Sequence, residues 1–257
     1  MKKFLTGAFC LLLSLCLILP AFAKGREYHW YCKRQKEHKQ ALCDPEMRFV
    51  EELDGYYIDH RHIENAADKV VYLTFDAGYE NGNVEKILNT LRDTQTPGAF
   101  FVLSHFVKAN PQLVQRMAGE GHLVCNHTAS HKNLSGAGRE EIAAELSALE
   151  AACETATGIR PAHYFRPPEG SFSREMLESV RALGYKTVFW SFAYADWDNN
   201  KQPKPEAALK LVLDNVHNGA VLLLHPTSAT NAEILPRLIG ELKAQGYRFG
   251  TLEELCQ

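Results

Sequence analysis

From about residue 68 onward, short apolar runs alternate with longer amphipathic stretches, and this alternation constrains the fold more than any other feature. Such runs are typical of buried parallel strands, and the stretches between them are long enough for helices that cross back over a sheet. Seven strands are predicted, at residues 70–75, 99–103, 122–125, 163–165, 186–190, 220–224 and 247–249. Six helices are predicted between them, at 84–94, 111–120, 139–157, 174–183, 205–216 and 231–245.

This number of strands and helices, in about 190 residues, predicts a distorted or incomplete (β/α) barrel of about seven parallel strands. A doubly wound open sheet is the alternative arrangement of the same α/β units. The whole chain has 257 residues, of which 46% are hydrophobic and 23% are charged. These values are typical of a globular protein, and the length suffices for one large α/β domain or for two small domains.

The first 23 residues match a secretory signal peptide. Lys2 and Lys3 supply the positive charge, residues 4–19 form an apolar run, and Ala21-Phe22-Ala23 fits an A-x-A cleavage site. A retained membrane anchor is the alternative interpretation. In either case we expect export, with the protein extracellular or associated with the cell wall or membrane.

Residues 24–66 form a polar N-terminal extension with little periodicity. We expect it to wrap around the main domain, at 67–257, or to link that domain to the membrane. The charge balance gives no sign of a nucleic-acid partner, because 28 Lys and Arg against 31 Asp and Glu leave a formal charge of −3. Removal of the signal segment takes away two lysines and leaves 26 − 31 = −5.

Five of the seven cysteines follow the signal segment, and an odd number leaves at least one thiol free. Cys32 and Cys43 are candidates for a disulfide, and reduced cysteines are the alternative that the sequence leaves open. The other three are Cys125, Cys153 and Cys256.

Polar side chains gather where the predicted strands end, which is the edge at which β/α barrels build their active sites. Asp76 ends the first strand, within T-F-D-A-G-Y. His127 and His131 follow the third strand, and on a helical turn this spacing would let both imidazoles bind one metal ion. Taken alone, the two motifs also fit a turn aspartate and a chance pair of surface histidines.

Three further clusters follow later strands. Arg166 opens R-P-P-E-G, whose prolines would fix the arginine and the amides of Glu169 and Gly170. Asp196 lies among aromatic residues, a setting that suits sugar stacking and the tethering of a histidine. His225 ends the apolar strand at 220–224. Each cluster also has a simpler interpretation. The Arg166 segment could be a rigid surface turn, the Asp196 segment the edge of an aromatic core, and His225 a structural histidine.

Together the five clusters resemble the polysaccharide deacetylases, also called the NodB homology domain or carbohydrate esterase family four. T-F-D-x-G, H-x-x-x-H, R-P-P-x-G, D-W and L-L-L-H occur in the order of that family, between about residues 70 and 255. The longer motifs T-F-D-x-G-Y-E-N-G and V-F-W-S-F-A-Y-x-D-W resemble one branch, the delta-lactam-biosynthetic de-N-acetylases. Members of that branch process N-acetylmuramic acid in spore-cortex peptidoglycan.

The resemblance implies a secreted hydrolase that cleaves the acetamide C–N bond of N-acetylmuramic acid in a peptidoglycan glycan strand, leading to muramic delta-lactam. Asp76 would be the general base and His225 the general acid. Asp196 would tether His225, and Arg166 would orient Asp76. A backbone amide near Glu169 would meet the oxyanion. Other substrate contacts are expected from Gly170, Tyr79, Trp197 and Leu223.

Two positions depart from the family pattern. Ala77 stands where most members carry a second Asp that ligates the metal. His127 and His131 are then the obvious ligands, with Asp76 as a third candidate, and a divalent ion, expected to be zinc, would be held weakly. Glu169 stands where many members have Tyr, which affects substrate contacts more than catalysis.

Two other functions stay open. The protein could be a glycan-binding pseudoenzyme in which Ala77 has ended catalysis, or a deacetylase of N-acetylglucosamine polymers such as chitin. The resemblance also implies functional coupling to a muramoyl-alanine amidase that first strips the peptide, and we expect a monomer.

Overall fold

The structure, a computed structural model, describes residues 25–63 and 67–257. The predicted signal peptide at 1–23 lies outside these described residues.

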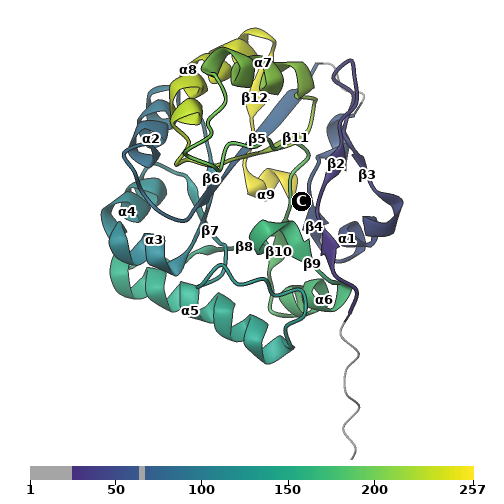
Figure 1. The fold of residues 1–257 in the computed structure, drawn as a ribbon, viewed down its shortest axis with the longest axis vertical. Helices are drawn as coiled ribbons and strands as arrows, with labels where there is room; N and C mark the ends of the chain where they lie inside the picture. Colours follow the sequence, from purple (N-terminus) through teal and green to yellow (C-terminus); the bar gives the residue numbers. More distant parts are fainter. Residues whose placement is uncertain (1–24, 64–66) are drawn as a thin grey trace, which may run out of the picture.

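An eight-stranded parallel sheet curves through the middle of the molecule (Figure 1). Its strand order is β11-β5-β6-β7-β8-β10-β4, with β12 also paired to β5. Two isolated bridges, Ile58 with Ala220 and Phe192 with Leu222, bring the two ends of this order together. The sheet is therefore the predicted incomplete barrel and not the open-sheet alternative. The strands are β4 (Gly55–Tyr56), β5 (Lys69–Ala77), β6 (Ala99–Val102), β7 (Leu123–Asn126), β8 (Ala162–Phe165), β10 (Lys186–Val188), β11 (Ala220–Leu224) and β12 (Tyr247–Phe249).

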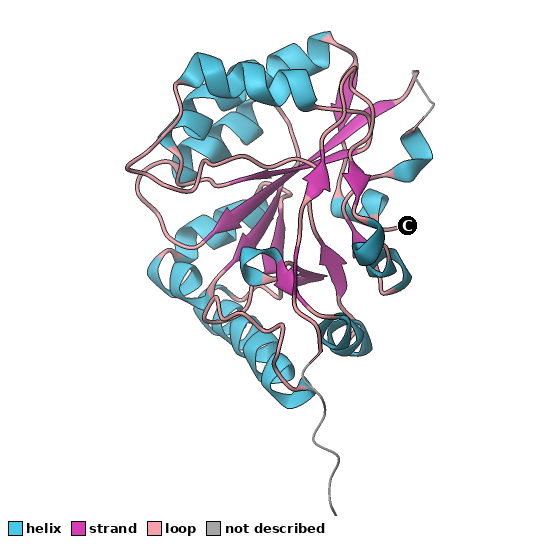
Figure 2. Cartoon of the chain, turned by 45° about the vertical axis from the view of Figure 1, so that its right-hand side comes forward, coloured by secondary structure: helices cyan, strands magenta, loops and turns pink. Residues whose placement is uncertain are grey.

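Helices surround the sheet (Figure 2). The six predicted ones are present: α2 (Val84–Asp93), α4 (Pro111–Gly119), α5 (Arg139–Thr157), α6 (Arg174–Ala182), α7 (Pro205–Asn215) and α8 (Ala229–Ala244). The sequence did not predict three short helices, α1 (Phe49–Glu52), α3 (Ser104–Ala109) and α9 (Leu252–Leu255). Helix α8 begins two residues before its predicted start, because the Ser228 side chain accepts from the amide of Asn231 and caps it there. Within the described ranges, no helix has both the length and the apolar character to span a membrane.

Strand β5 divides its side chains between two apolar layers. Val71, Leu73, Phe75 and Ala77 pack in the cluster that includes helix α2, whereas Val70 and Tyr72 pack in the cluster inside the barrel. Because successive side chains of a strand point to opposite faces, Asp76 projects on the inner face at the carboxyl end of β5. This placement brings Asp76 to the mouth of the barrel.

The N-terminal segment, residues 25–63, packs along one side of the barrel (Figure 1). Strand β1 (Tyr28–His29) pairs with β9 (Ser171–Phe172), and β4 belongs to the main sheet. Strands β2 (Cys32–Lys33) and β3 (Leu42–Cys43) form a hairpin in which Cys32 lies directly opposite Cys43. Both cysteines are free thiols in the structure. The residues that the structure describes also contain three 3₁₀ turns, at Pro45–Met47, His60–His62 and Pro168–Gly170.

Candidate active site

A cavity of about 870 Å³ opens at the carboxyl ends of the strands. Nine of the eleven predicted site residues line it: Asp76, Tyr79, His127, His131, Glu169, Gly170, Trp197, Leu223 and His225. The other two, Arg166 and Asp196, are fully buried behind this lining, where each contacts one of its titratable residues. The structure therefore brings all eleven residues together.

Asp76 is held by a buried arginine. Arg166 Nη1 donates to Asp76 Oδ1 at 2.8 Å, with the Asp76 side chain 10% exposed and that of Arg166 0% exposed. Burial raises the pKa of the Asp76 carboxyl, but the positive charge and the hydrogen bond of Arg166 outweigh it, so the net pKa lies below its ordinary value. Asp76 is thus an ionised carboxylate at neutral pH, as a general base requires.

The Arg166 guanidinium is fixed on all sides. Its Nε donates to the Val188 carbonyl at 2.9 Å, and its Nη2 donates to Thr74 Oγ1 at 2.9 Å. Its carbon centre lies 4.2 Å from the centroid of the Phe101 ring. A guanidinium held by so many contacts can hold one oxygen of Asp76 in place while the other stays toward the cavity.

The segment that carries His127 and His131 is a loop, so the predicted helical turn is wrong. Thr128 and His131 have φ values of 71° and 61°, in the left-handed region. Side-chain oxygens capture the amides that a helix would use: Asn126 Oδ1 accepts from the Thr128 amide, and Thr128 Oγ1 accepts from the His131 amide, each at 2.9 Å. The loop still brings the two imidazoles together, with ring centroids 5.0 Å apart.

His127 is oriented for a ligand. Its Nδ1 lies 2.8 Å from the Arg166 carbonyl, an acceptor, so Nδ1 carries the proton and Nε2 presents a lone pair. Nε2 lies 3.6 Å from Asp76 Oδ2. Burial lowers the pKa of His127 to about 4, so the ring is neutral at pH 7. A backbone acceptor on the far nitrogen is the usual support of a metal-binding histidine.

These donors fit two positions of a metal site and leave the third open. Within residues 25–63 and 67–257, no cluster of three or more His, Cys, Asp or Glu is arranged to hold a metal ion. Ala77, between Asp76 and Gly78, is fully buried in the outer apolar cluster. Its neighbours on both sides line the cavity, whereas Ala77 does not. Two imidazoles with Asp76 beside them are the donors that this chain offers a divalent ion.

His225 is held by Asp196 on the other side of the cavity. His225 Nδ1 donates to Asp196 Oδ1 at 2.7 Å, and the His225 amide donates to Asp196 Oδ2 at 2.8 Å. Asn231 donates to the same Oδ2 at 2.6 Å. Burial lowers the pKa of His225, but the hydrogen bond and charge of Asp196 outweigh it, so the net pKa is raised. Nε2 of a cationic imidazole can then give a proton to a leaving group.

The loop after strand β8 places a strained residue at the cavity. Glu169 has φ 59°, in the left-handed region, where a non-glycine residue costs about 1 kcal/mol or more. The amide of Gly170 already donates to the Pro167 carbonyl at 3.1 Å, which leaves the Glu169 amide as the candidate oxyanion donor. At Gly170, a Cβ atom would lie 2.8 Å from Trp190 Cη2, so glycine is needed there.

The sequence missed the part of the N-terminal segment that supports this loop. The Trp30 amide donates to the Gly170 carbonyl at 2.8 Å, and Trp30 Nε1 donates to the Trp190 carbonyl at 2.8 Å. Trp30 also stacks on Phe189, with ring centroids 4.3 Å apart. The available signal was an apolar Trp inside an otherwise polar extension. Sequence reasoning also did not assign Trp190 and Tyr194, which line the cavity.

Comparison with known proteins supports the family expected from the motifs. Residues 63–188 match the family model described as polysaccharide deacetylase. The peptidoglycan-N-acetylmuramic acid deacetylase PdaA of Bacillus subtilis is 39% identical over 228 residues, which cover 88% of this chain and 85% of PdaA. The solved structure of B. subtilis PdaA, a family 4 carbohydrate esterase, matches with a TM-score of 0.84 and 38% identity. That match covers 89% of this chain and 96% of the PdaA chain.

Two further relatives show the range of the family. A peptidoglycan-N-acetylglucosamine deacetylase of Bacillus cereus is 33% identical over 199 residues, 74% of this chain and 89% of that protein. A Bacillus anthracis protein described as a family pseudoenzyme matches with a TM-score of 0.70 and 29% identity, over 79% of this chain and 69% of that one. This chain therefore belongs to the polysaccharide deacetylases of carbohydrate esterase family four, which are hydrolases acting on amide bonds.

Proposed function

We propose that this protein hydrolyses the acetamide of N-acetylmuramic acid in peptidoglycan, releasing acetate and leaving a free amine on the sugar. The observation that carries the proposal is that two titratable groups line one cavity and each forms an ion pair with a buried residue behind it. Asp76 is paired with Arg166, and His225 is paired with Asp196. One is ready to accept a proton and the other to donate one. The substrate named for PdaA supports the choice of sugar.

In the proposed mechanism, Asp76 Oδ2 takes a proton from a water molecule, whose oxygen attacks the acetamide carbonyl. The Glu169 amide donates to the oxyanion. His225 gives its Nε2 proton to the sugar nitrogen as the C–N bond breaks, and Asp196 stabilises its cationic ring. Leu223, buried on strand β11 and lining the cavity, packs against the acetyl methyl.

Deacetylases of this family are generally metal-dependent. We propose that His127 and His131 hold a divalent ion, zinc by the chemistry of imidazole donors, with Asp76 beside it. When bound, the ion would act as a Lewis acid toward the acetamide carbonyl. With two imidazoles and no carboxylate at Ala77, binding is expected to be weak.

The setting of the reaction is part of the proposal. Residues 1–23 would direct export, residues 24–66 form the extension, and 67–257 form the deacetylase domain, acting as a monomer on the glycan strand at the cell wall or membrane. The free amine and the lactyl carboxylate of the product could then close to the muramic delta-lactam of a spore cortex, after a muramoyl-alanine amidase has removed the peptide.

The test is mass spectrometry of peptide-free muropeptides after incubation with the protein, with and without a chelator. We expect muramic residues to lose one acetyl group, chelation to stop the loss, and added zinc to restore it. The His225→Ala variant is the matched control and should release no acetate. If muramic residues keep their acetyl groups with zinc, cobalt or manganese supplied, the proposal is wrong.

A second substrate is favoured by the Bacillus cereus relative, whose name specifies N-acetylglucosamine in peptidoglycan. Competition between chitooligosaccharides and peptide-free muropeptides separates the two, because the preferred sugar will suppress acetate release from the other. A pseudoenzyme, the third alternative, would bind peptidoglycan and give the same result with wild-type protein and Asp76→Asn in every assay.

A further inference from the structure

The hairpin of strands β2 and β3 places two thiols side by side. Cys32 lies directly opposite Cys43 in the antiparallel register, and the next pair is Lys33 with Leu42. Residues opposite each other in such a ladder have Cα atoms about 4.5–5.5 Å apart, and their side chains lie on the same face. A disulfide spans Cα distances of about 4.4–6.8 Å. The backbone of the hairpin therefore already holds the two cysteines at the separation that a disulfide needs.

Both cysteines lie on the face of the hairpin that packs on the protein. They contact the apolar cluster that contains Trp30. Cys32 Sγ donates to the Trp190 carbonyl at 3.6 Å, and Cys43 Sγ donates to the Asp44 carbonyl at 3.4 Å. Since a thiol is a weak donor, these two hydrogen bonds contribute little to the docking of the hairpin. Neither sulfur atom would lose a strong partner by entering a disulfide.

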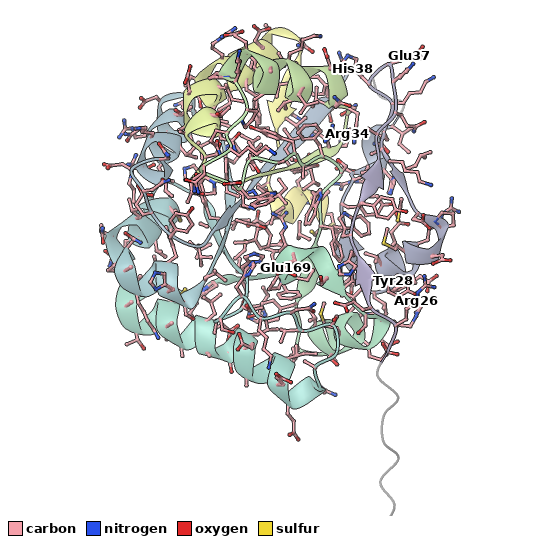
Figure 3. The ribbon with its side chains drawn as sticks, viewed as in Figure 1. Arg26, Tyr28, Arg34, Glu37, His38 and Glu169 are labelled. Carbon is pink, nitrogen blue, oxygen red and sulfur yellow. The ribbon has the colours of Figure 1, made fainter. Side chains whose placement is uncertain are left out.

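The hairpin has little else to hold its two strands together. Its ladder consists of two residue pairs, and a two-stranded hairpin is by itself marginally stable in water. At its tip, at the edge of the molecule, Glu37 and His38 have φ values of 60° and 55°, in the left-handed region that non-glycine residues seldom adopt (Figure 3). A covalent bond between the strands would offset both the short ladder and the strained turn.

The hairpin begins two residues after Trp30, the residue that supports the active-site loop. The Trp30 amide donates to the Gly170 carbonyl, and its Nε1 donates to the Trp190 carbonyl, both at 2.8 Å. Cys32 Sγ donates to the same Trp190 carbonyl. A crosslink at Cys32 therefore restrains the chain beside the contacts that hold the loop of Glu169 and Gly170.

We propose that Cys32 and Cys43 form a disulfide in the exported protein, and that this bond locks the N-terminal segment onto the active-site loop. The inference rests on the export that is part of the proposed function, because disulfides persist in oxidising surroundings. In the reaction, one thiolate attacks a small-molecule or protein disulfide, and the second thiolate then displaces the attached sulfur. The two cysteines lose two electrons and two protons, and the oxidant leaves as two thiols.

The burial of the thiols determines when the bond forms. Burial raises the pKa of the Cys43 thiol to about 11 and also raises the pKa of Cys32, so the folded protein contains little of the reactive thiolate. The disulfide therefore forms during folding, when only the short loop between the two strands has to close. Once the hairpin has docked, the same burial protects the bond from reductants.

The first test is a peptide map of the full chain, unfolded in urea, refolded in a buffer of reduced and oxidised glutathione, alkylated and cut with trypsin. Lysine or arginine at positions 33, 34, 36 and 39 puts the two cysteines on separate peptides, 27–33 and 40–48. We expect one species whose mass is the sum of these peptides minus two hydrogens, and reduction should divide it. Alkylated cysteines in the separate peptides, or a crosslink to a different cysteine, overturn the inference.

The second test measures hydrogen exchange at the Trp30 amide, whose protection reports its docking on Gly170. Reduction of wild-type protein should lower this protection about tenfold or more. Cys43→Ala should show the lower protection with and without reductant. Cys153→Ala is the matched control, because it removes a buried thiol from helix α5 and should keep the wild-type ratio between the oxidised and reduced states.

A general loss of stability lowers the protection in both states, so their ratio isolates the effect of the disulfide. Equal protection of oxidised and reduced wild-type protein, or loss of the difference in Cys153→Ala, overturns the lock. Neither test uses a substrate, so failure of the wild-type protein to release acetate from muramic residues overturns the proposed function alone.

Discussion

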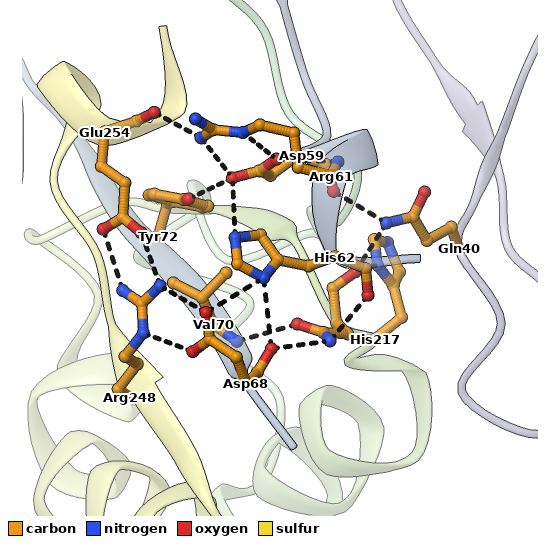
Figure 4. Close-up of polar contacts among 11 residues, drawn as sticks. Gln40, Asp59, Arg61, His62, Asp68, Val70, Tyr72, His217, Arg248 and Glu254 are labelled. Carbon is orange, nitrogen blue, oxygen red and sulfur yellow. Dashed lines mark hydrogen bonds and ion pairs between the residues drawn. The ribbon is translucent and has the colours of Figure 1, made fainter. Parts of the chain in front are cut away.

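The two ends of the barrel each carry a cluster of charges around a buried carboxylate, and the clusters are built differently. At the amino end of strand β5, Asp59 accepts from Arg61 and from the Tyr72 hydroxyl, and its Oδ2 lies 3.4 Å from His62 Nε2 (Figure 4). Arg248 in the same cluster bridges Asp68 and Glu254, with N–O distances of 2.7 Å and 2.5 Å. Each charged side chain in this group contacts an opposite charge from the protein itself.

At the catalytic end, the protein leaves functional atoms facing the cavity. Arg166 holds Asp76 through Oδ1, while Oδ2 lies 3.6 Å from His127. The His225 side chain is 26% exposed and its Nδ1 is held by Asp196. The difference shows which charged groups indicate a catalytic site. Each reactive group has one atom held by the protein and another atom directed into a cavity large enough for a substrate.

The largest contrast between the two ends is expected from Asp76→Asn. The amide cannot take a proton from water, so acetate release should fall by about 10²–10⁴-fold. The melting temperature should also fall, because the fully buried Arg166 loses its counter-charge, although the amide keeps the shape and one acceptor for it. Acetate release and thermal melting measure the two effects. A rate above one tenth of wild type would reject the role of Asp76.

At the opposite end, Asp59→Asn should lower stability and leave the rate of the folded protein unchanged. The change weakens the charged hydrogen bonds that Asp59 accepts from the half-exposed Arg61 and from Tyr72, so the free energy of unfolding should fall by about 2 kcal/mol. The kcat of the folded protein should stay within about twofold of wild type, because Asp59 lies outside the cavity lining. Urea unfolding and acetate release test this. A large loss of kcat without a loss of stability would show that the two clusters are coupled.

A smaller effect is expected from Asp196→Asn. Asp196 holds the pKa of His225 above its ordinary value against the effect of burial, so removing its charge should lower that pKa. The general acid is active when protonated, so the alkaline limb of the rate profile should move to lower pH. Activity near neutral pH should fall about tenfold. A rate profile whose alkaline limb keeps its position would show that another group sets it.

The smallest effect is expected from Ala77→Asp. A carboxylate at this fully buried position should lower the melting temperature without metal, because the charge is desolvated. Since Asp76 and Gly78 both line the cavity, a short turn could bring the new carboxylate to the two imidazoles. Zinc should then bind more tightly than to wild-type protein and recover the lost stability. Equal zinc affinities by calorimetry would show that residue 77 faces only the helix layer.

The sequence predicted the barrel and the site residues because both depend on local patterns. His225 directly follows the apolar strand β11, and Asp76 is the penultimate residue of β5. The positions of the apolar runs are therefore enough to place both residues at the same edge of the sheet. Their roles came from the resemblance, because nothing local shows that Asp196 lies against His225, 29 residues away.

The parts of the fold that the sequence did not predict have little recognisable sequence pattern. Strand β4 has two residues and joins the sheet through backbone bonds, such as that from the Phe189 amide to the Tyr56 carbonyl at 2.7 Å, which need no particular side chains. The prediction for the loop that carries His127 and His131 was wrong for the opposite reason. The i, i+4 spacing suggests a helical turn, but the side-chain oxygens of Asn126 and Thr128 accept the hydrogen bonds of the amides that a helix would use. Side-chain acceptors of this kind decide the backbone only once the fold has placed them.

The support of the site by the N-terminal segment has a consequence for the order of folding. Trp30 and Trp190 are 160 positions apart, and Trp30 is made long before its partner. During synthesis, the first described residues must therefore wait for the last third of the chain before they can dock. Contacts of such long sequence separation slow folding. The catalytic loop is thus expected to be among the last parts of the molecule to become rigid.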